Sequence, residues 1–177
     1  MTLKNILSTY WTLRAYLERH ILSDHWVVKR RYYRVNQCYP DLENPKDFTE
    51  KICWIKLNGI TELHKRCANK ITARDYVAEL LGPETLIPQV LITHDVEDLN
   101  PETITQRQFV IKANHDSGSV IACHDRAEFD WALAREKMSR ALKRKFHHNH
   151  VERQYSGFEP AIIVEKMLKG KDGETSA

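Results

Sequence analysis

Apolar residues recur every three or four positions in several stretches of the chain, which is the spacing of amphipathic helices. The stretches with this spacing lie at residues 6–22, 47–59, 69–81 and 125–142. Short runs of β-branched and aromatic residues, which are typical of strands, lie at residues 86–93, 109–111, 120–122 and 161–164. The pattern predicts a mixed α/β (α+β) fold that opens with a helical region.

Capping signals set the boundaries of three of these helices. Asp47 with Glu50, and Asp125 with Glu128, have the three-residue spacing of a capping box. Gly82, which precedes a proline, marks the end of the helix over residues 69–81. The inward faces predicted for the three helices are, in order, Phe48, Ile52 and Ile55; Ala73, Val77 and Leu80; and Trp131, Ala134, Met138 and Leu142.

The stretch from Gln108 to Cys123 has the pattern of two strands joined by a polar loop, residues 114–119. One interpretation is an ordinary hairpin turn. The other is an anion nest, in which backbone N–H groups bind a nucleotide phosphate and Lys112 adds a positive charge. Lys70, in the first turn of its predicted helix, opposes the helix dipole unless an anion lies nearby. A solvated lysine at residue 70 is the alternative.

Composition and charge narrow the class of protein. Hydrophobic residues make up 42% and charged residues 29% of the 177 residues, which is typical of a soluble globular protein and excludes a disordered chain. Positive charge is concentrated at residues 1–37 and 135–153, and negative charge at residues 41–104. Basic zones can face a phosphate-bearing ligand, an anionic membrane or nucleic acid, although most charge runs are solvated surface.

Residues 6–22 predict either a helix packed on the core or a membrane-surface helix bearing Trp11. The run at residues 29–34 mixes Lys and Arg with Tyr. A helix that buries its tyrosine rings and keeps its cations in water explains this run better than a nucleic-acid site, so no nucleic-acid partner is expected. Three histidines within residues 147–150 lack the spacing of a zinc site, and we assign no metal ligand.

The four cysteines lie far apart without a C-x-x-C pair, and no signal peptide opens the chain. No apolar run exceeds four residues, far below the ~20 that a membrane span requires. We therefore expect reduced thiols and a cytoplasmic protein, attached at most peripherally to the inner membrane face through its basic residues 1–37.

Five blocks of residues, in this order, resemble the TupA-like ATP-grasp proteins of teichuronopeptide and cell-surface polysaccharide biosynthesis. The blocks are Asn44–Ile52 with Trp54–Leu57; Asn69–Lys70 with Arg74–Val77; Leu86–Pro88; Phe109–His115 with Ser117–Ser119; and Gln154–Tyr155 with Pro160 and Val164–Leu168. The resemblance covers about residues 30–170. It implies a helical region over residues 1–60 and the amino-terminal ATP-grasp subdomain, incomplete, over residues 61–177.

In ATP-grasp enzymes two subdomains clamp ATP and activate a carboxylate as an acyl phosphate, which an amine or similar nucleophile then attacks. The resemblance implies that Lys70 and Lys112 bind phosphate and that a mobile loop closes over the triphosphate. It implies that Glu165 accepts a hydrogen bond from the adenine amino group. The remaining residues implied to bind ATP are Asn114, Ser117, Gly118 and Ser119 in the loop, and Ile163, Lys166, Met167 and Leu168 around the adenine.

Two residues depart from the family pattern. Asp116 replaces a glycine, which places a carboxylate beside phosphate and a Cβ where a positive φ is expected. Asn69 replaces an acidic residue. The family's magnesium ligands and its catalytic arginine follow the last matched block, so we assign no catalytic residue here and expect magnesium only with a complementing carboxy-terminal half. Two functions remain: an ATP-grasp ligase present as a partial chain, or a non-catalytic remnant that binds a membrane or a protein.

Overall fold

The computed structural model describes residues 22–144, 151–169 and 175–176. The helix predicted over residues 6–22, with Trp11, and the histidines of residues 147–150 therefore lie outside the described residues, apart from Leu22. The chain divides into two compact units, which we describe separately. The first comprises residues 1–62 and 145–156, and the second comprises residues 63–144 and 157–177.

The first unit is built around two helices, α2 (Asp24–Asn36) and α3 (Phe48–Trp54), and α3 continues as a π-helical turn, η1 (Ile55–Gly59). The short 3-10 helix η5 (Arg153–Tyr155) also belongs to this unit. Its core consists of Val27, Val28, Tyr32, Cys53 and Val151. The prediction that the run at residues 29–34 is a helix that buries its tyrosine rings is confirmed for Tyr32 and wrong for Tyr33, which is 40% exposed.

The capping box at the start of α3 is present, with the Asp47 side chain and the Glu50 side chain each accepting from the backbone of the other residue. The Glu50 carboxylate also accepts from the N–H groups of Asp41 and Lys46, and these bonds hold the pKa of Glu50 below its usual range. The prediction that Phe48 faces inward is wrong, since it is 78% exposed. Burying Glu50 turns Cys53, one turn later, toward the core instead.

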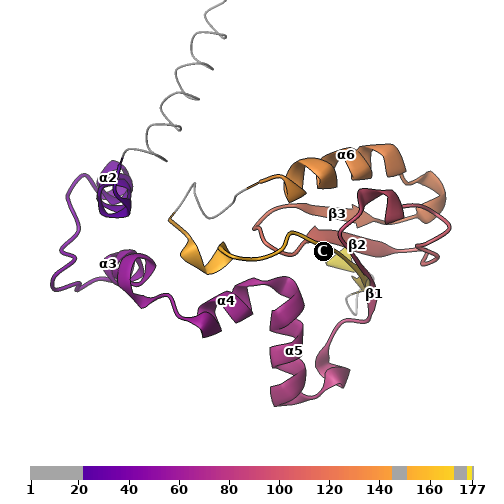
Figure 1. Ribbon diagram of the computed structural model, residues 1–177, viewed down its shortest axis with the longest axis horizontal. Helices are drawn as coiled ribbons and strands as arrows, with labels where there is room; N and C mark the ends of the chain where they lie inside the picture. Colours follow the sequence, from indigo (N-terminus) through magenta and orange to yellow (C-terminus); the bar gives the residue numbers. More distant parts are fainter. Residues whose placement is uncertain (1–21, 145–150, 170–174, 177) are drawn as a thin grey trace, which may run out of the picture. The chain divides into compact units, whose positions relative to one another are not determined.

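The second unit contains a four-stranded antiparallel sheet in the order β1-β4-β2-β3 (Figure 1). The strands are β1 (Gln89–Thr93), β2 (Phe109–Ala113), β3 (Val120–Cys123) and β4 (Ile162–Lys166). The predicted hairpin is confirmed, with β2 and β3 paired antiparallel. The predicted first strand begins later than residue 86, because Pro88 has no N–H for a ladder, and it lies at the sheet edge as that proline requires.

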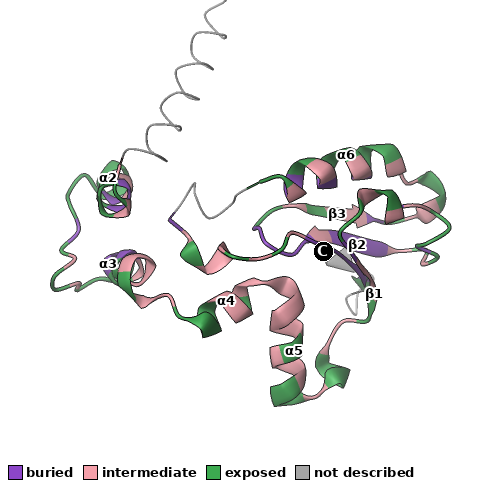
Figure 2. Ribbon diagram, in the orientation of Figure 1, coloured by how far each residue is buried: buried purple, intermediate pink, exposed green. Residues whose placement is uncertain are grey.

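Helix α6 (Trp131–Leu142) covers one face of this sheet. The core between them contains Leu99, Ile104, Phe109, Ile111, Cys123, Ala134, Met138, Ile162 and Val164. Figure 2 shows that β2 is buried along nearly its whole length. The predicted capping box at Asp125 is wrong for α6: Asp125 caps the 3-10 turn η4 (Arg126–Glu128), and Asp130 caps α6 by accepting from Leu133 N–H at 2.9 Å.

Helices α4 (Glu62–Ala68) and α5 (Lys70–Leu81) precede the sheet, followed by the 3-10 turns η2 (Pro83–Thr85) and, after β1, η3 (Val96–Asp98). Helix α5 ends at Gly82, as predicted, where φ is +89°, and Asn69 caps its start. The prediction that Leu80 faces inward is wrong, since it is 63% exposed. Figure 1 shows why: α5 meets the sheet at its first turns and then runs away from it.

The chain after β4 continues into a second, two-stranded sheet. Strand β5 (Leu168–Lys169) pairs antiparallel with β6 (Thr175–Ser176). Glu165 and Lys166 lie within β4 instead of after it. The mixed α/β class is confirmed. In the part of the chain that is described, no helix has the length and apolar character to cross a membrane.

Candidate functional site

The candidate site lies on the sheet face away from α6. Phe109 and Ile111 of β2 belong to the core under α6. Side chains alternate along a strand, so Lys112 projects from the opposite face. Residues paired across strands share a face, and Glu165 of β4 pairs with Val110 of β2. Lys112 and Glu165 therefore project from the same face.

Glu165 is the centre of a buried ion network. One of its oxygens accepts from Arg74 Nη1 at 2.6 Å and the other from Lys112 Nζ at 3.1 Å. The Glu165 side chain is 11% exposed, and a carboxylate at that depth requires ionic partners. Arg74 also donates from Nη2 to the carbonyl of Ile87 at 2.5 Å. Arg74 thus connects three parts of the fold: helix α5, strand β4 and the segment that precedes β1.

Lys70, the first residue of α5, holds the loop that joins β2 and β3. Its ammonium donates to the carbonyls of Ala113 at 2.7 Å and Asp116 at 2.5 Å. Its backbone N–H donates to the carbonyl of Asn114 at 3.1 Å. Burial lowers the pKa of Lys70, and the positive charge of Lys112 acts in the same direction. A partly buried cation with a lowered pKa gains from a bound anion, because the anion stabilises its charged form.

Asn114 fixes the start of the loop. Its buried side chain accepts from the N–H of Ala161 at 2.8 Å and donates to the carbonyl of Glu159 at 2.9 Å. The same carbonyl oxygen of the side chain contacts His115 Nδ1 at 3.0 Å. These bonds anchor the loop to the residues that lead into β4. The Asn114 backbone N–H also donates to the Ala161 carbonyl, at 2.9 Å, so both the side chain and the amide of Asn114 are occupied within the fold. A backbone contact with phosphate therefore has to come from later in the loop.

Asp116 is 2% exposed, and its carboxylate accepts from the hydroxyl and the backbone N–H of Ser119. The expected positive φ at Asp116 is wrong: among the described residues, the non-glycine residues with positive φ are Gln37 and Val151. The left-handed residue of the loop is Gly118, at φ +127°, two positions further along. Asp116 therefore closes the loop through its side chain without backbone strain.

The tip of the loop is open. Ser117 and Gly118 are exposed, and Ser119 is half-buried. A Cβ built on Gly118 would have nothing within 4 Å, so glycine is required here for its φ and not for lack of space. An anion can approach this tip from solvent, as the nest interpretation requires.

Of the residues predicted around the adenine, Lys166, Met167 and Leu168 lie at the end of β4 away from the loop, whereas Ile163 lies near the loop and pairs with Lys112. Ile163 is buried in the sheet, Met167 is buried, and Leu168 is 45% exposed. The N–H of Lys166 donates to the Pro88 carbonyl at 2.9 Å, and the N–H of Met167 to the Gln108 carbonyl at 3.5 Å. Hydrogen bonds from these two amides are thus already made within the sheet.

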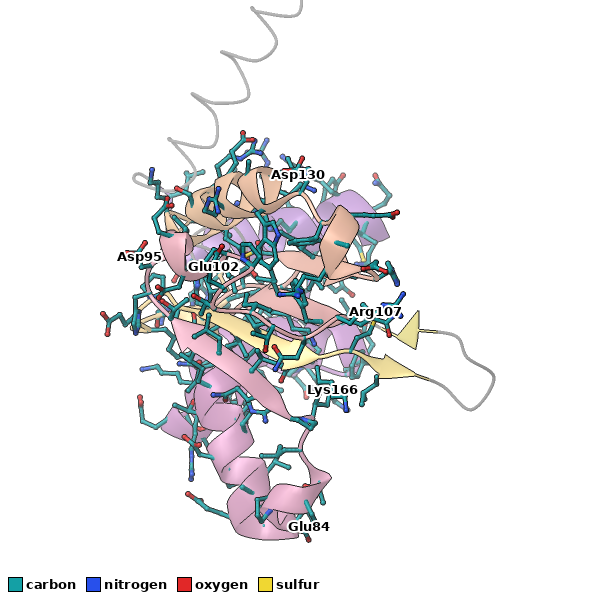
Figure 3. The ribbon with its side chains drawn as sticks, turned by 90° about the vertical axis from the view of Figure 1, so that its right-hand side faces the viewer. Glu84, Asp95, Glu102, Arg107, Asp130 and Lys166 are labelled. Atoms are coloured by element: carbon teal, nitrogen blue, oxygen red, sulfur yellow. The ribbon has the colours of Figure 1, made fainter. Side chains whose placement is uncertain are left out.

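A groove of about 680 Å³ adjoins this segment, and it is lined by Pro88, Gln106, Arg107, Gln108, Lys166, Met167 and Leu168. Figure 3 shows Arg107 and Lys166 at the same end of the sheet. Four residue steps separate Ile162, next to the loop, from Lys166, about 13 Å at ~3.3 Å per residue. The loop and the adenine contacts predicted at Lys166–Leu168 therefore lie toward opposite ends of β4, whereas Ile163 and Glu165 lie beside Lys112.

The structure brings together Lys70, Lys112, the loop of residues 114–119 and Glu165. It adds Arg74, to which the sequence pattern assigned no role. The signal was present, because Arg74 follows Lys70 by four residues and such residues share a helix face. Three cations here face the carboxylates of Glu165 and Asp116, so the cluster keeps an excess positive charge that fits a polyphosphate.

Among the described residues, no group of three or more His, Cys, Asp or Glu side chains is placed to hold a metal ion.

The sheet, its lysine-bearing face and the loop at its end are features expected of an amino-terminal ATP-grasp subdomain. The chain belongs to the TupA-like ATPgrasp family, whose model matches residues 50–175. The family predicted from the five blocks of residues is therefore confirmed. Comparison with curated proteins and with solved structures gives no match.

Proposed function

We propose that this chain binds the triphosphate of ATP with Lys70, Lys112 and the loop of residues 114–119. The observation that carries the proposal is the convergence of two lysines, from α5 and β2, on one sheet face beside a loop with an open tip. Membership of the ATP-grasp family supports ATP as the nucleotide. Lysine acts on phosphate as a flexible point charge and needs no fixed geometry to do so.

Both lysines are held in place before any ligand binds. Lys112 lies against Glu165, and Lys70 against the loop carbonyls. An ammonium group has three donors, so each lysine can keep such a contact and still donate to a phosphoryl oxygen. Each Glu165 oxygen likewise has a second lone pair, so the carboxylate can accept from an adenine amino group while it remains paired with Arg74.

The reaction that this binding serves is, in our proposal, the activation of a carboxylate as an acyl phosphate and its ligation to an amine or similar nucleophile during cell-surface polysaccharide synthesis. Bound ATP supplies the phosphoryl group. The residues described here orient the triphosphate and neutralise part of its charge. As a partner we propose a complementing carboxy-terminal half that supplies the magnesium ligands, and we propose that the reaction, which consumes ATP, takes place in the cytoplasm.

A second function is favoured by one observation: the partners of Lys70 and Lys112 within the fold already give these cations a structural role. On this account the chain is a non-catalytic remnant of the family that acts as an interaction module. The two functions differ in whether a triphosphate binds at the lysines.

Isothermal titration calorimetry with ATP and magnesium separates them, at protein concentrations that detect millimolar affinity. We expect binding that weakens at least about tenfold in Lys112→Gln and in Lys70→Gln, since each substitution removes a cation near phosphate. Lys137→Gln is the charge-matched control, because Lys137 is an exposed residue of α6, and it is expected to leave binding unchanged. No binding, or equal binding by all four proteins, would support the interaction module.

A further inference from the structure

One face of α2 carries aromatic and basic side chains together. Trp26, Lys29, Arg30 and Tyr33 have the i, i+3, i+4, i+7 spacing that places residues on one side of a helix. Trp26 is 42% and Tyr33 is 40% exposed. The buried residues of α2, which are Val27, Val28 and Tyr32, belong to the core of the first unit. Helix α2 is therefore amphipathic, and its aromatic and basic face is turned to solvent.

The rings on this face are ordered by their neighbours. The Arg30 guanidinium lies 4.8 Å from the centre of the Trp26 ring. Tyr33 stacks on Tyr39, with 4.8 Å between ring centres, and Tyr39 is itself 68% exposed. We call Trp26, Lys29, Arg30, Tyr33 and Tyr39 the outer face of α2. It presents aromatic edges and tips interleaved with positive charge.

The charge of α2 is strongly one-sided. Its acidic residue is Asp24, whose carboxylate is paired with Arg153 of the same unit. Its basic residues are Lys29, Arg30, Arg31 and Arg34. The net positive charge of this helix therefore favours an anionic partner, and its exposed aromatic rings favour a partner with a boundary between apolar groups and water.

We propose that the outer face of α2 docks on the surface of an anionic lipid bilayer. Tryptophan and tyrosine favour the headgroup level of a membrane, where the ring is partly desolvated and its polar atom stays wet. Lysine and arginine on the same face reach lipid phosphates. A helix of this kind lies in the plane of the interface without crossing it, which suits a short, 13-residue helix.

The same residue types also contact single-stranded nucleic acid, but the geometry favours a membrane. Binding of a single strand uses ring faces as platforms for bases. Here one face of the Trp26 ring is covered by Arg30, and one face of Tyr33 by Tyr39. Each of these two rings therefore offers at most one face to a base, whereas its edge and polar atom are the parts that enter a headgroup layer. This docking does not depend on nucleotide binding at the lysines of the second unit.

Co-sedimentation of the full chain with phosphatidylcholine vesicles, with and without about a third of phosphatidylglycerol, tests the proposal. We expect binding to the anionic vesicles that disappears at high salt, because exposed charges are screened within a few ångströms there. Lys29→Gln with Arg30→Gln should weaken binding about thirtyfold, since the loss of each cation should weaken it about fivefold. Trp26→Ser with Tyr33→Ser should weaken binding although the charge is unchanged. Tyr39→Ser, which leaves α2 itself unaltered, should weaken binding less.

Lys137→Gln with Lys143→Gln removes the same charge from exposed positions of the second unit and should leave vesicle binding intact. Thermal unfolding followed by circular dichroism verifies that each variant is folded. The proposal is overturned if neutral vesicles bind equally well, if the α2 variants bind like the parent chain, or if a single-stranded oligonucleotide binds more tightly than the anionic vesicles.

Discussion

Lys112 and Glu165 lie on adjacent strands of the sheet, 53 residues apart in sequence, and Lys112 Nζ donates to a Glu165 oxygen at 3.1 Å. The two residues are diagonal neighbours, because Lys112 pairs with Ile163 and Glu165 with Val110. The register of the two strands therefore brings Lys112, a predicted phosphate ligand, into contact with Glu165, a predicted adenine ligand. It makes Glu165 a group that orients Lys112 as well as a candidate contact for the nucleotide.

Arg74→Gln is expected to destabilise the second unit by about 2–4 kcal/mol, because it removes one ionic partner from a buried carboxylate and the donor to the Ile87 carbonyl. Urea unfolding measures the loss. Arg66 and Glu79 form the matched exposed pair, so Arg66→Gln should cost much less. Equal losses in the two variants would show that the Glu165 network contributes no more than a surface ion pair.

Two substitutions of Asp116, which departs from the family pattern, separate the effect of its charge from the effect of its hydrogen bonds to Ser119. Asp116→Asn removes a negative charge beside the proposed phosphate site and keeps an oxygen for Ser119, so ATP affinity should rise about threefold to tenfold. Asp116→Gly also removes the charge but releases the loop, so its gain should be smaller. Calorimetric titration of both variants with ATP and magnesium measures the two affinities. A larger gain for glycine would mean that the side chain of Asp116 does not organise the loop.

Tyr32 provides a prediction for the first unit. Burial, together with the hydrogen bond from its hydroxyl to Asp47 at 3.0 Å, raises the pKa of Tyr32 to about 12. A raised pKa means that the stability contributed by the neutral phenol is complete below pH 10 and is lost as the pH rises through about 12. Ultraviolet titration of the seven tyrosines should show one late component, absent in Tyr32→Phe and present in Tyr33→Phe. Its persistence in Tyr32→Phe would contradict the assignment.

The four cysteines should fall into two reactivity classes. Cys38 and Cys67 are exposed, whereas Cys53 and Cys123 are buried. Burial also raises the pKa of Cys123 to about 11, so little thiolate is present at neutral pH. A thiol reagent such as Ellman's should therefore modify two thiols quickly and the others only on unfolding. Fast modification of Cys123 in the native protein would mean that the core under α6 opens.

Local signals in the sequence predicted much of this fold. The hairpin of β2 and β3 followed from two β-branched runs around a polar loop, and Asp47 with Glu50 formed the expected capping box. The errors arose where a short pattern had two solutions. Asp125 was expected to cap a long helix, but it caps a 3-10 turn, and Asp130, five residues later, caps α6. Spacing alone does not distinguish these two caps.

The sequence predicted most of the residues of the candidate site but not the contacts between them. Lys70 was indicated by its place at a helix start and Lys112 by its place before a polar loop, and the family resemblance added Glu165. The bridge that Arg74 makes to Glu165, in contrast, spans 91 residues and depends on strand order. Asn114 was assigned to the ligand, yet its side chain anchors the loop to Glu159 and Ala161. Such long-range partners have no local sequence signal, because they are set by how strands and helices meet.

The central claim is that Lys112 and the loop that follows it contact the phosphates of ATP. The most direct measurement is a two-dimensional amide NMR titration of the chain with ATP and magnesium, repeated on Lys112→Gln. We predict shifts concentrated at Lys70 and at residues 112–119 in the parent chain, with at least about a tenfold weaker apparent affinity in the variant. Shifts that avoid these residues, or that are identical in the two proteins, would contradict the claim.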